Sequence, residues 1–233
     1  MMDRAAGFTL LEIAIVLVVM AVVTGGLLSP LKARLEGARY RETRVALELA
    51  ERAIVGYSVS RGAQLPCPDG DGDGTEDLVD PPAGVSGPNV RTGSRCRLAA
   101  GMLPWRTLGL HRADAWGSPL LYHPDAALLS EAGLGTPPQT MSNLSVIEAG
   151  SGTALTLRAP DGPVAIVLSC GPNRRVDASL DSAGQGGGCG LAPEAHGGRY
   201  RYGPPGAASD DVVRWLSKNV LLAELVYAGA WPR

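Results

Sequence analysis

The sequence is poor in the side chains that usually build large cores and reactive centres. Its 233 residues include one phenylalanine and three histidines, against 31 glycines and 18 prolines. This composition predicts a loop-rich domain with a modest core. The histidines, at positions 111, 123 and 196, have no metal-ligand spacing, and no acid–base set converges. We therefore predict that the chain is not an enzyme.

Excess positive charge and known catalytic motifs are also missing. The formal net charge is −2, so no bulk basic surface predicts a nucleic-acid partner. The Ser-x-x-Lys match at 29–32 lacks the partner motifs of its enzyme class. The glycine-rich stretch at 184–190 has no strand before it and no helix after it, which argues against a phosphate loop.

The four cysteines form no Cys-x-x-Cys pair, which argues against a zinc site. An even number behind a hydrophobic segment predicts disulfides in an oxidising compartment. Among the three possible pairings we favour Cys67–Cys96 and Cys170–Cys189, because each pair brackets a loop-like stretch. Each closed loop would add about 3–4 kcal/mol of stability. Four buried free thiols are the alternative.

A long hydrophobic run follows the N-terminus. Residues 10–28 are apolar or small except for Glu12 and Thr24, and at 1.5 Å per residue they nearly span a bilayer core of about 30 Å. A charge inside such a core costs about 3 kcal/mol, so Glu12 should have a partner. No small-x-small site follows the run, so it is not an ordinary secretory signal. Basic residues are more numerous after the run than before it. By the loop-charge rule, this asymmetry places the C-terminal side in the cytoplasm, which conflicts with the oxidising compartment predicted from the disulfides.

The stretch Gly7-Phe8-Thr9-Leu10-Leu11-Glu12 and the apolar helix after it resemble the prepilin signal of type IV pilins and type II secretion pseudopilins. The resemblance covers roughly residues 4 to 30. It implies that a prepilin peptidase at the cytoplasmic face cuts between Gly7 and Phe8, and that the new Phe8 amine is methylated. Glu12 would then be the fifth mature residue, where the family has a glutamate. The resemblance also implies a cytoplasmic N-terminus and a periplasmic domain, against the loop-charge rule.

The resemblance supplies a partner for Glu12. In a filament, the Phe8 amine of one subunit can pair with Glu12 of its neighbour, which offsets desolvation and specifies the axial stagger. An incidental carboxylate near the membrane surface is the alternative. The implied partners are other pilins or pseudopilins, the prepilin peptidase, the inner-membrane assembly platform and membrane lipid.

One helix is predicted from about residue 8 to residue 60. Beyond the hydrophobic run, apolar side chains recur at helical spacing and form one stripe, made of Leu31, Leu35, Ala38, Val45, Leu49, Ala53 and Tyr57. Gly25, Gly26 and Pro30 predict a kink or local melting. We expect a leader at 1–7, a transmembrane and assembly helix at 8–30, the periplasmic half of the helix at 31–61, and a globular domain at 62–233.

The globular domain should be small and contain both helices and strands. Residues 114–124 predict a turn and then a strand, with Trp116 over the core, and they resemble a stretch of major pseudopilins. Asp161-Gly162 predicts a hairpin, and residues 212–228 predict a strand followed by a short helix. Asp210-Asp211 resembles the late Asp-Asp-strand segment of pseudopilin-like domains. The expected fold is α+β and pilin-like: a long N-terminal helix packed on a small antiparallel sheet, stapled by disulfides.

An acidic loop is the most chemically suggestive feature of this domain. Its candidate ligands, in the D-x-D-x-D-G spacing of calcium loops, are Asp69, Asp71, Asp73, Thr75, Asp77 and Asp80. A hard cation would relieve the repulsion between these carboxylates, so calcium is the predicted cofactor. A solvated acidic turn is the alternative, since no helix pair flanks the loop. Asn173, Asp177 and Asp181 make a weaker second candidate.

The sequence therefore predicts a structural subunit, a minor pilin or pseudopilin of a type IV pilus or a type II secretion pseudopilus. Its predicted location is the bacterial inner membrane, as a single-pass protein with a periplasmic C-terminal domain, and then the filament. The alternative is an adhesive or substrate-binding module at the filament tip that uses a calcium-stabilised loop.

Overall fold

A computed structural model of the chain describes residues 9–79, 96–129, 134–135, 137–140, 144–178, 188–189, 198–206 and 209–231, without the side chains of 24–30. The chain forms two compact units, Met1–Arg41 and Glu42–Arg233. Each unit is described separately below.

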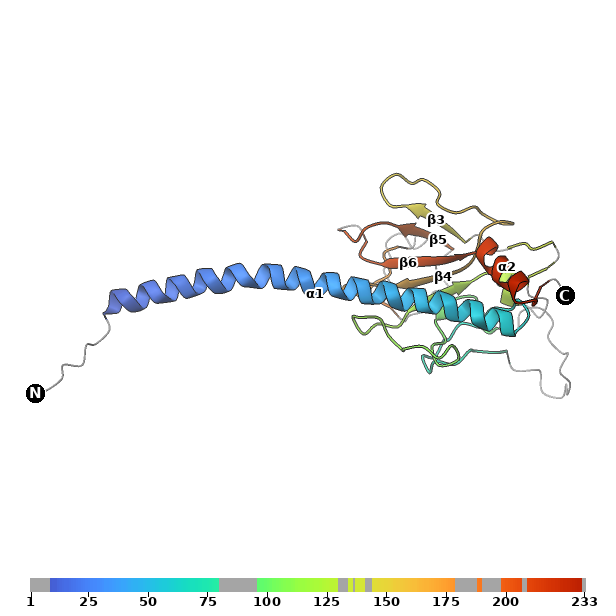
Figure 1. Cartoon of the computed structure of the whole chain (residues 1–233), viewed down its shortest axis with the longest axis horizontal. Helices are drawn as coiled ribbons and strands as arrows, with labels where there is room; N and C mark the ends of the chain where they lie inside the picture. Colours follow the sequence, from blue (N-terminus) through green and yellow to red (C-terminus); the bar gives the residue numbers. More distant parts are fainter. Residues whose placement is uncertain are drawn as a thin grey trace, which may run out of the picture. The chain divides into compact units, whose positions relative to one another are not determined.

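Helix α1 runs from Leu10 to Ser60, a length of 51 residues (Figure 1). The Thr9 hydroxyl accepts the backbone N–H of Glu12 at 3.2 Å and so caps the first turn. The helix passes through Gly25, Gly26 and Pro30 without a break, so the predicted local melting is wrong. A proline removes one helical hydrogen bond, and the intact turns on both sides hold the helix across that gap.

The face of α1 that packs on the domain is not the predicted apolar stripe. Within the second unit, the buried residues of α1 are Thr43, Leu47, Ala50, Ile54 and Ser58. Val45 and Leu49 of the predicted stripe are 54% and 46% exposed. The buried face contains small and polar residues, which a search for apolar periodicity overlooks. One of them, Thr43, accepts the backbone N–H of Ala115 at 3.3 Å.

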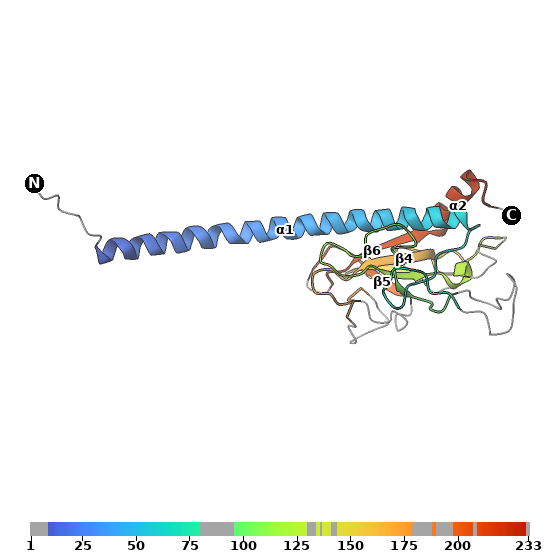
Figure 2. The same ribbon diagram turned by 90° about the horizontal axis from the view of Figure 1, so that it is seen from below.

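The main sheet is antiparallel, as predicted, with the strand order β1-β2-β4-β6. Figure 2 shows two of its strands, β4 and β6. Its strands are β1 (Gly101–Met102), β2 (Leu121–Pro124), β4 (Pro163–Ser169) and β6 (Val212–Ser217). A second sheet of two parallel strands, β3 (Ser145–Glu148) and β5 (Arg199–Tyr202), was not predicted. The 3-10 helix η1 (Ala126–Leu129) follows β2. Helix α2 (Lys218–Tyr227) follows β6, as predicted, and Ser217 caps its N-terminus.

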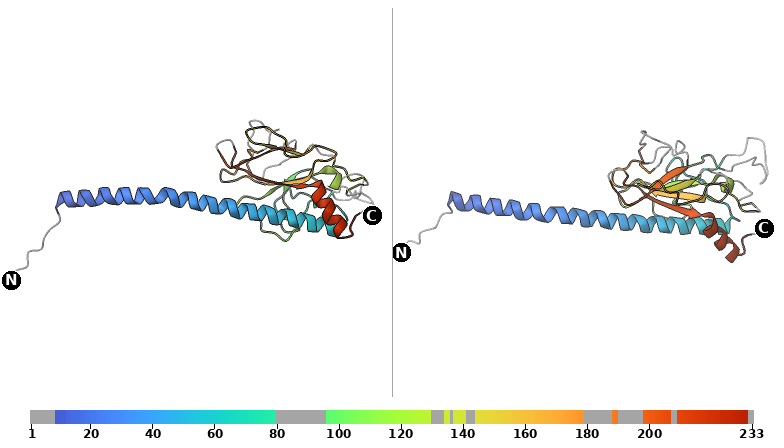
Figure 3. Two further views of the ribbon diagram at one scale, coloured as in Figure 1. Left: turned by 45° about the horizontal axis from the view of Figure 1, so that its top comes forward. Right: turned by 90° about the horizontal axis from the view of Figure 1, so that it is seen from above.

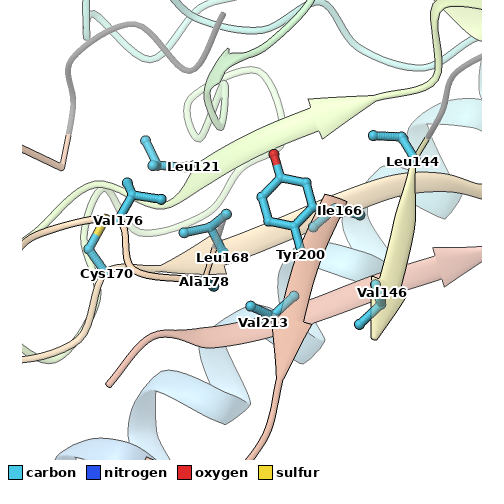
Figure 4. Close-up of a cluster of buried hydrophobic side chains, with 10 residues drawn as sticks. All are labelled: Leu121, Leu144, Val146, Ile166, Leu168, Cys170, Val176, Ala178, Tyr200 and Val213. Carbon is cyan, nitrogen blue, oxygen red and sulfur yellow. The ribbon is translucent and has the colours of Figure 1, made fainter. Parts of the chain in front are cut away.

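The core joins the two sheets. Figure 4 shows its cluster, which consists of Leu121, Leu144, Val146, Ile166, Leu168, Cys170, Val176, Ala178, Tyr200 and Val213. The Tyr200 hydroxyl lies 2.8 Å from Nδ1 of His123 on β2, which gives this buried phenol a polar partner. The α+β pilin-like architecture is thus confirmed.

Both predicted disulfides are present, with Cα–Cα distances of 5.2 Å for Cys67–Cys96 and 6.0 Å for Cys170–Cys189. The hairpin predicted around Asp161-Gly162 is wrong. Strand β4 pairs with β2 and β6, while the segment before it folds back on β3. Leu155 donates its backbone N–H to the Val146 carbonyl at 2.8 Å, and the Thr156 hydroxyl accepts the Val146 N–H at 2.8 Å.

Candidate functional site

The first turns of α1 carry exposed apolar side chains. Between residues 10 and 23, the large apolar side chains range in exposure from 48% at Ile13 to 89% at Leu10. Glu12 lies among them and is also exposed. Its carboxylate makes no hydrogen bond or ion pair with any residue that the structure describes. Gly7 and Phe8, the predicted processing residues, lie outside the described residues.

This segment is the part of the chain that the comparisons identify. Residues 2–28 match the family profile of the prokaryotic N-terminal methylation motif. The motif is the type IV pilin and pseudopilin signal. Searches of curated proteins and of solved structures found no match to the chain. The methylation motif thus supports a subunit of the pilin or pseudopilin kind.

Among the residues that the structure describes, no helix combines the length and the apolar character needed to cross a membrane. The transmembrane span predicted at 8–30, which overlaps the methylation motif, is therefore not confirmed.

The acidic loop gathers three of its predicted ligands. Carboxylate oxygens of Asp69, Asp71 and Asp73 lie within 4.8 Å of one another. Asp69 is fully buried, and its carboxylate accepts the backbone N–H groups of Asp71, Gly72 and Gly74 at 3.1, 2.7 and 2.8 Å. Burial raises the pKa of Asp69, against the lowering effect of the Gly72 and Gly74 N–H groups. Asp69 thus organises the loop from inside.

The other predicted ligands of this loop have separate contacts. The Thr75 hydroxyl donates to Asp73 at 2.6 Å, and this hydrogen bond lowers the pKa of Asp73. Asp77 accepts the Gly70 N–H at 2.9 Å, and Asp80 lies outside the described residues. Glu76, which the sequence did not single out, accepts the Tyr57 hydroxyl of α1 at 2.8 Å. The loop is therefore held by its own hydrogen bonds and tied to α1.

Replacing Asp69 by alanine should destabilise the domain by about 2–3 kcal/mol, because three N–H groups of the loop lose their buried acceptor. The Asp73→Ala control should cost much less, because that carboxylate is exposed and, among the residues described, hydrogen-bonds only to Thr75. Urea unfolding of the two variants measures the difference. Equal losses would contradict the organising role of Asp69.

A second carboxylate cluster joins Asp177 to Asp210 and Asp211, whose ligand oxygens also lie within 4.8 Å of one another. Asp211 Oδ2 accepts the backbone N–H groups of Asp177 and Ala178 at 2.7 and 2.6 Å. Asp210 Oδ2 accepts the Asn173 N–H at 3.0 Å. The Asn173 side-chain amide donates to Asp177 at 2.6 Å.

This cluster leaves two buried oxygens without donors. Oδ1 of Asp210 and Oδ1 of Asp211 have no hydrogen-bond partner among the described residues. Asp211 is only 6% exposed, and burial raises the pKa of its carboxyl to about 7, against the lowering effect of the Ala178 and Asp177 N–H groups. Buried carboxylates without donors are costly unless a cation or proton neutralises them. The cluster therefore has the donor chemistry of a hard-cation site.

The structure brings together two members of the predicted second cation set, which is Asn173, Asp177 and Asp181. Asn173 and Asp177 belong to the cluster, while Asp181 lies outside the described residues. In the sequence, the acidic pair Asp210-Asp211 was assigned a resemblance to a segment of pseudopilin-like domains, and no role as a cation ligand. It enters the site because the antiparallel β4–β6 pairing places Val212 opposite Ser169. That pairing brings the residue before β6 close to the loop after β4. The sequence feature that could have identified this site is the pair of consecutive aspartates immediately before a predicted strand.

Proposed function

We propose that the chain is a structural subunit of the minor kind, without catalytic activity, in a type IV pilus or a type II secretion pseudopilus. The observation that supports this most directly is the methylation motif over residues 2–28. The exposed apolar start of α1 and the disulfide-stapled α+β domain fit the same role.

In this proposal the apolar start of α1 lies first in the bacterial inner membrane, with the domain in the periplasm, and then in the filament. The prepilin peptidase, the assembly platform and membrane lipid are its partners before assembly. Other pilins or pseudopilins are its partners afterwards. Exposed apolar side chains from residue 10 to residue 23 would be covered by lipid and then by neighbouring helices, which removes their contact with water in both states.

Glu12 has a specific place in this assembly. Its carboxylate has no partner among the described residues, and proteolysis after Gly7 would create a new cation at Phe8. Pairing the amine of one subunit with Glu12 of the next would satisfy both charges in an apolar bundle. A wrong stagger would leave them unpaired, so the pair also selects the register of assembly.

Processing is the first test of the proposed function. Intact-mass analysis of the chain from its producing cells should find a mature form that begins at Phe8 and carries one N-terminal methyl group. Gly7→Leu should block cleavage and leave the seven-residue leader in place, whereas the Ala5→Leu control should be cut normally. A mature chain that begins elsewhere, or lacks the methyl group, would refute the proposal.

Calcium is a second component of the proposed function. We propose that Asp177, Asp210 and Asp211 hold it, because Oδ1 of Asp210 and Oδ1 of Asp211 are buried and have no donor within the described part of the chain. The loop at 69–80 is the competing calcium site, and there the carboxylate of Asp69 already accepts three N–H groups.

The tip-binding alternative uses the same loop. Its supporting observation is the gathering of Asp69, Asp71 and Asp73. Deleting residues 69–80 distinguishes the two roles. Loss of filaments would favour assembly, and intact filaments that no longer attach would favour a binding module.

A further inference from the structure

Helix α2 lies beside the C-terminal end of α1 (Figure 3). Residues of both helices line a groove of about 600 Å³. Val55, Gly56 and Val59 line it from α1, and Val220 and Tyr227 line it from α2. A cleft of this size is typical of binding sites. Both walls are helices, so the groove has the form that receives an apolar helix face.

Large apolar side chains of α2 are exposed to solvent beside the groove. Helix α2 buries Leu221 and Leu225 against the domain, while Val220 and Tyr227, which line the groove, are 48% and 91% exposed. A surface that gathers large apolar side chains beside a groove marks an interaction site more often than isolated exposed residues do. The groove therefore offers an apolar surface that a partner could cover.

Gly56 forms the open floor of this groove. It lies inside α1, where glycine is less favourable than alanine. A side chain at this position would meet no atom within 4 Å, so neither close packing nor a positive φ inside the domain requires a glycine there. Its absent side chain does allow the backbone of another chain to approach α1 closely.

The charges at the groove specify the partner further. Arg214 pairs with Glu51 and, at 3.8 Å, with Glu48, and Glu48 also pairs with Arg52 at 3.7 Å. The carboxylate of Glu224 lines the groove as well and has no ion pair among the described residues. The charge left without a partner is thus negative, so a complementary occupant carries a basic side chain.

We propose that the groove between α1 and α2 binds an amphipathic helix of another filament subunit, with its apolar side chains between Val59 and Tyr227 and a lysine or arginine beside Glu224. The partner helix crosses α1 at Gly56. This inference rests on the proposed filament role, but it concerns residues outside the methylation motif, so it can fail while that role stands.

Site-specific photocrosslinking of the full-length chain in its producing cells tests this proposal. A benzoylphenylalanine probe replaces Tyr227, and the crosslinked peptide is sequenced by mass spectrometry. The expected product is a helical segment with an apolar face and at least one basic residue. Gly56→Trp should reduce the yield at least tenfold. The matched control Leu49→Trp, which lies on α1 outside the groove and is itself exposed, should leave the yield unchanged.

The charge contact is tested in the same strain. Glu224→Lys should reduce crosslinking several-fold, and reversing the basic residue of the captured helix to glutamate should restore it. The proposal is overturned if the probe yields no adduct, a lipid adduct, or a non-helical or acidic segment, or if Leu49→Trp lowers the yield as much as Gly56→Trp. Intact-mass analysis of leader cleavage in each variant separates this outcome from a failure of the filament role.

Discussion

Replacing Glu12 by alanine is expected to remove the chain from filaments while leaving cleavage of its leader intact. Glu12 lies in a run of exposed apolar side chains and has no partner among the described residues. Inside a bundle of such helices, the amine of a neighbour would lose its counter-ion. Breaking one partner of a buried ion pair costs about 3–5 kcal/mol, which corresponds to more than a hundredfold in the assembly equilibrium.

The measurement is the ratio of chain in sheared filaments to chain in membranes, by quantitative immunoblot. Glu12→Gln should fail like Glu12→Ala, because it keeps the size of the side chain and removes only the charge. Glu36→Ala is the matched control on the same helix. Glu36 is exposed, and its one ion pair within the described structure is with Lys32 at 3.9 Å, so its loss should change little. Normal incorporation of Glu12→Ala would exclude the pairing.

Replacing Asp211 by asparagine is expected to have opposite effects on stability with and without calcium. The pKa of Asp211 rises from 3.8 to about 7 in the folded domain because the carboxyl is buried. The folded state therefore holds the proton more tightly than the unfolded chain does. Without a cation, stability should be lost as pH rises from about 4 to about 7, by on the order of 4 kcal/mol.

Calcium bound to the ionised carboxylates would remove that loss. At pH 8 in a chelator, Asp211→Asn should be more stable than the natural chain, because it has no buried charge. With millimolar calcium the order should reverse, because the variant has lost a ligand. Thermal unfolding at pH 5 and pH 8 in both conditions gives the four comparisons.

Asp71→Asn is the control for this experiment, since it alters the other acidic site. It should keep the calcium stabilisation in full. If Asp71→Asn loses the stabilisation and Asp211→Asn keeps it, the ion belongs to the loop at 69–80. If calcium stabilises none of the chains, both sites are purely structural.

Local sequence patterns predicted the elements that depend on neighbouring residues. The methylation motif, the helix α1, the strand before α2 and both disulfide pairs follow from short stretches or from bracketed loops. Local patterns did not predict which face of α1 packs on the domain, because two of the residues buried there, Thr43 and Ser58, are small and polar. Their burial depends on what the sheet places opposite them.

Asp210 and Asp211 were missed as members of the second carboxylate cluster for a related reason. Asp177 and Asp211 are separated by 34 residues, and their contact exists only because β6 returns beside β4. The acidic loop, by contrast, was found easily because its residues are adjacent. Asp69, Asp71 and Asp73 gather as expected, but much of the capacity of Asp69 and Asp73 is used by N–H groups of the loop itself.

The Thr9 cap has a consequence for the chemistry of the mature N-terminus. Because α1 begins at Leu10, cleavage after Gly7 leaves only two residues ahead of the helix. The first turn of a helix carries roughly half a positive charge from its unpaired N–H groups. The new amine would therefore add to a charge that the helix already has. A neighbouring carboxylate would meet a combined electropositive end, which methylation of the amine preserves because the nitrogen stays protonated.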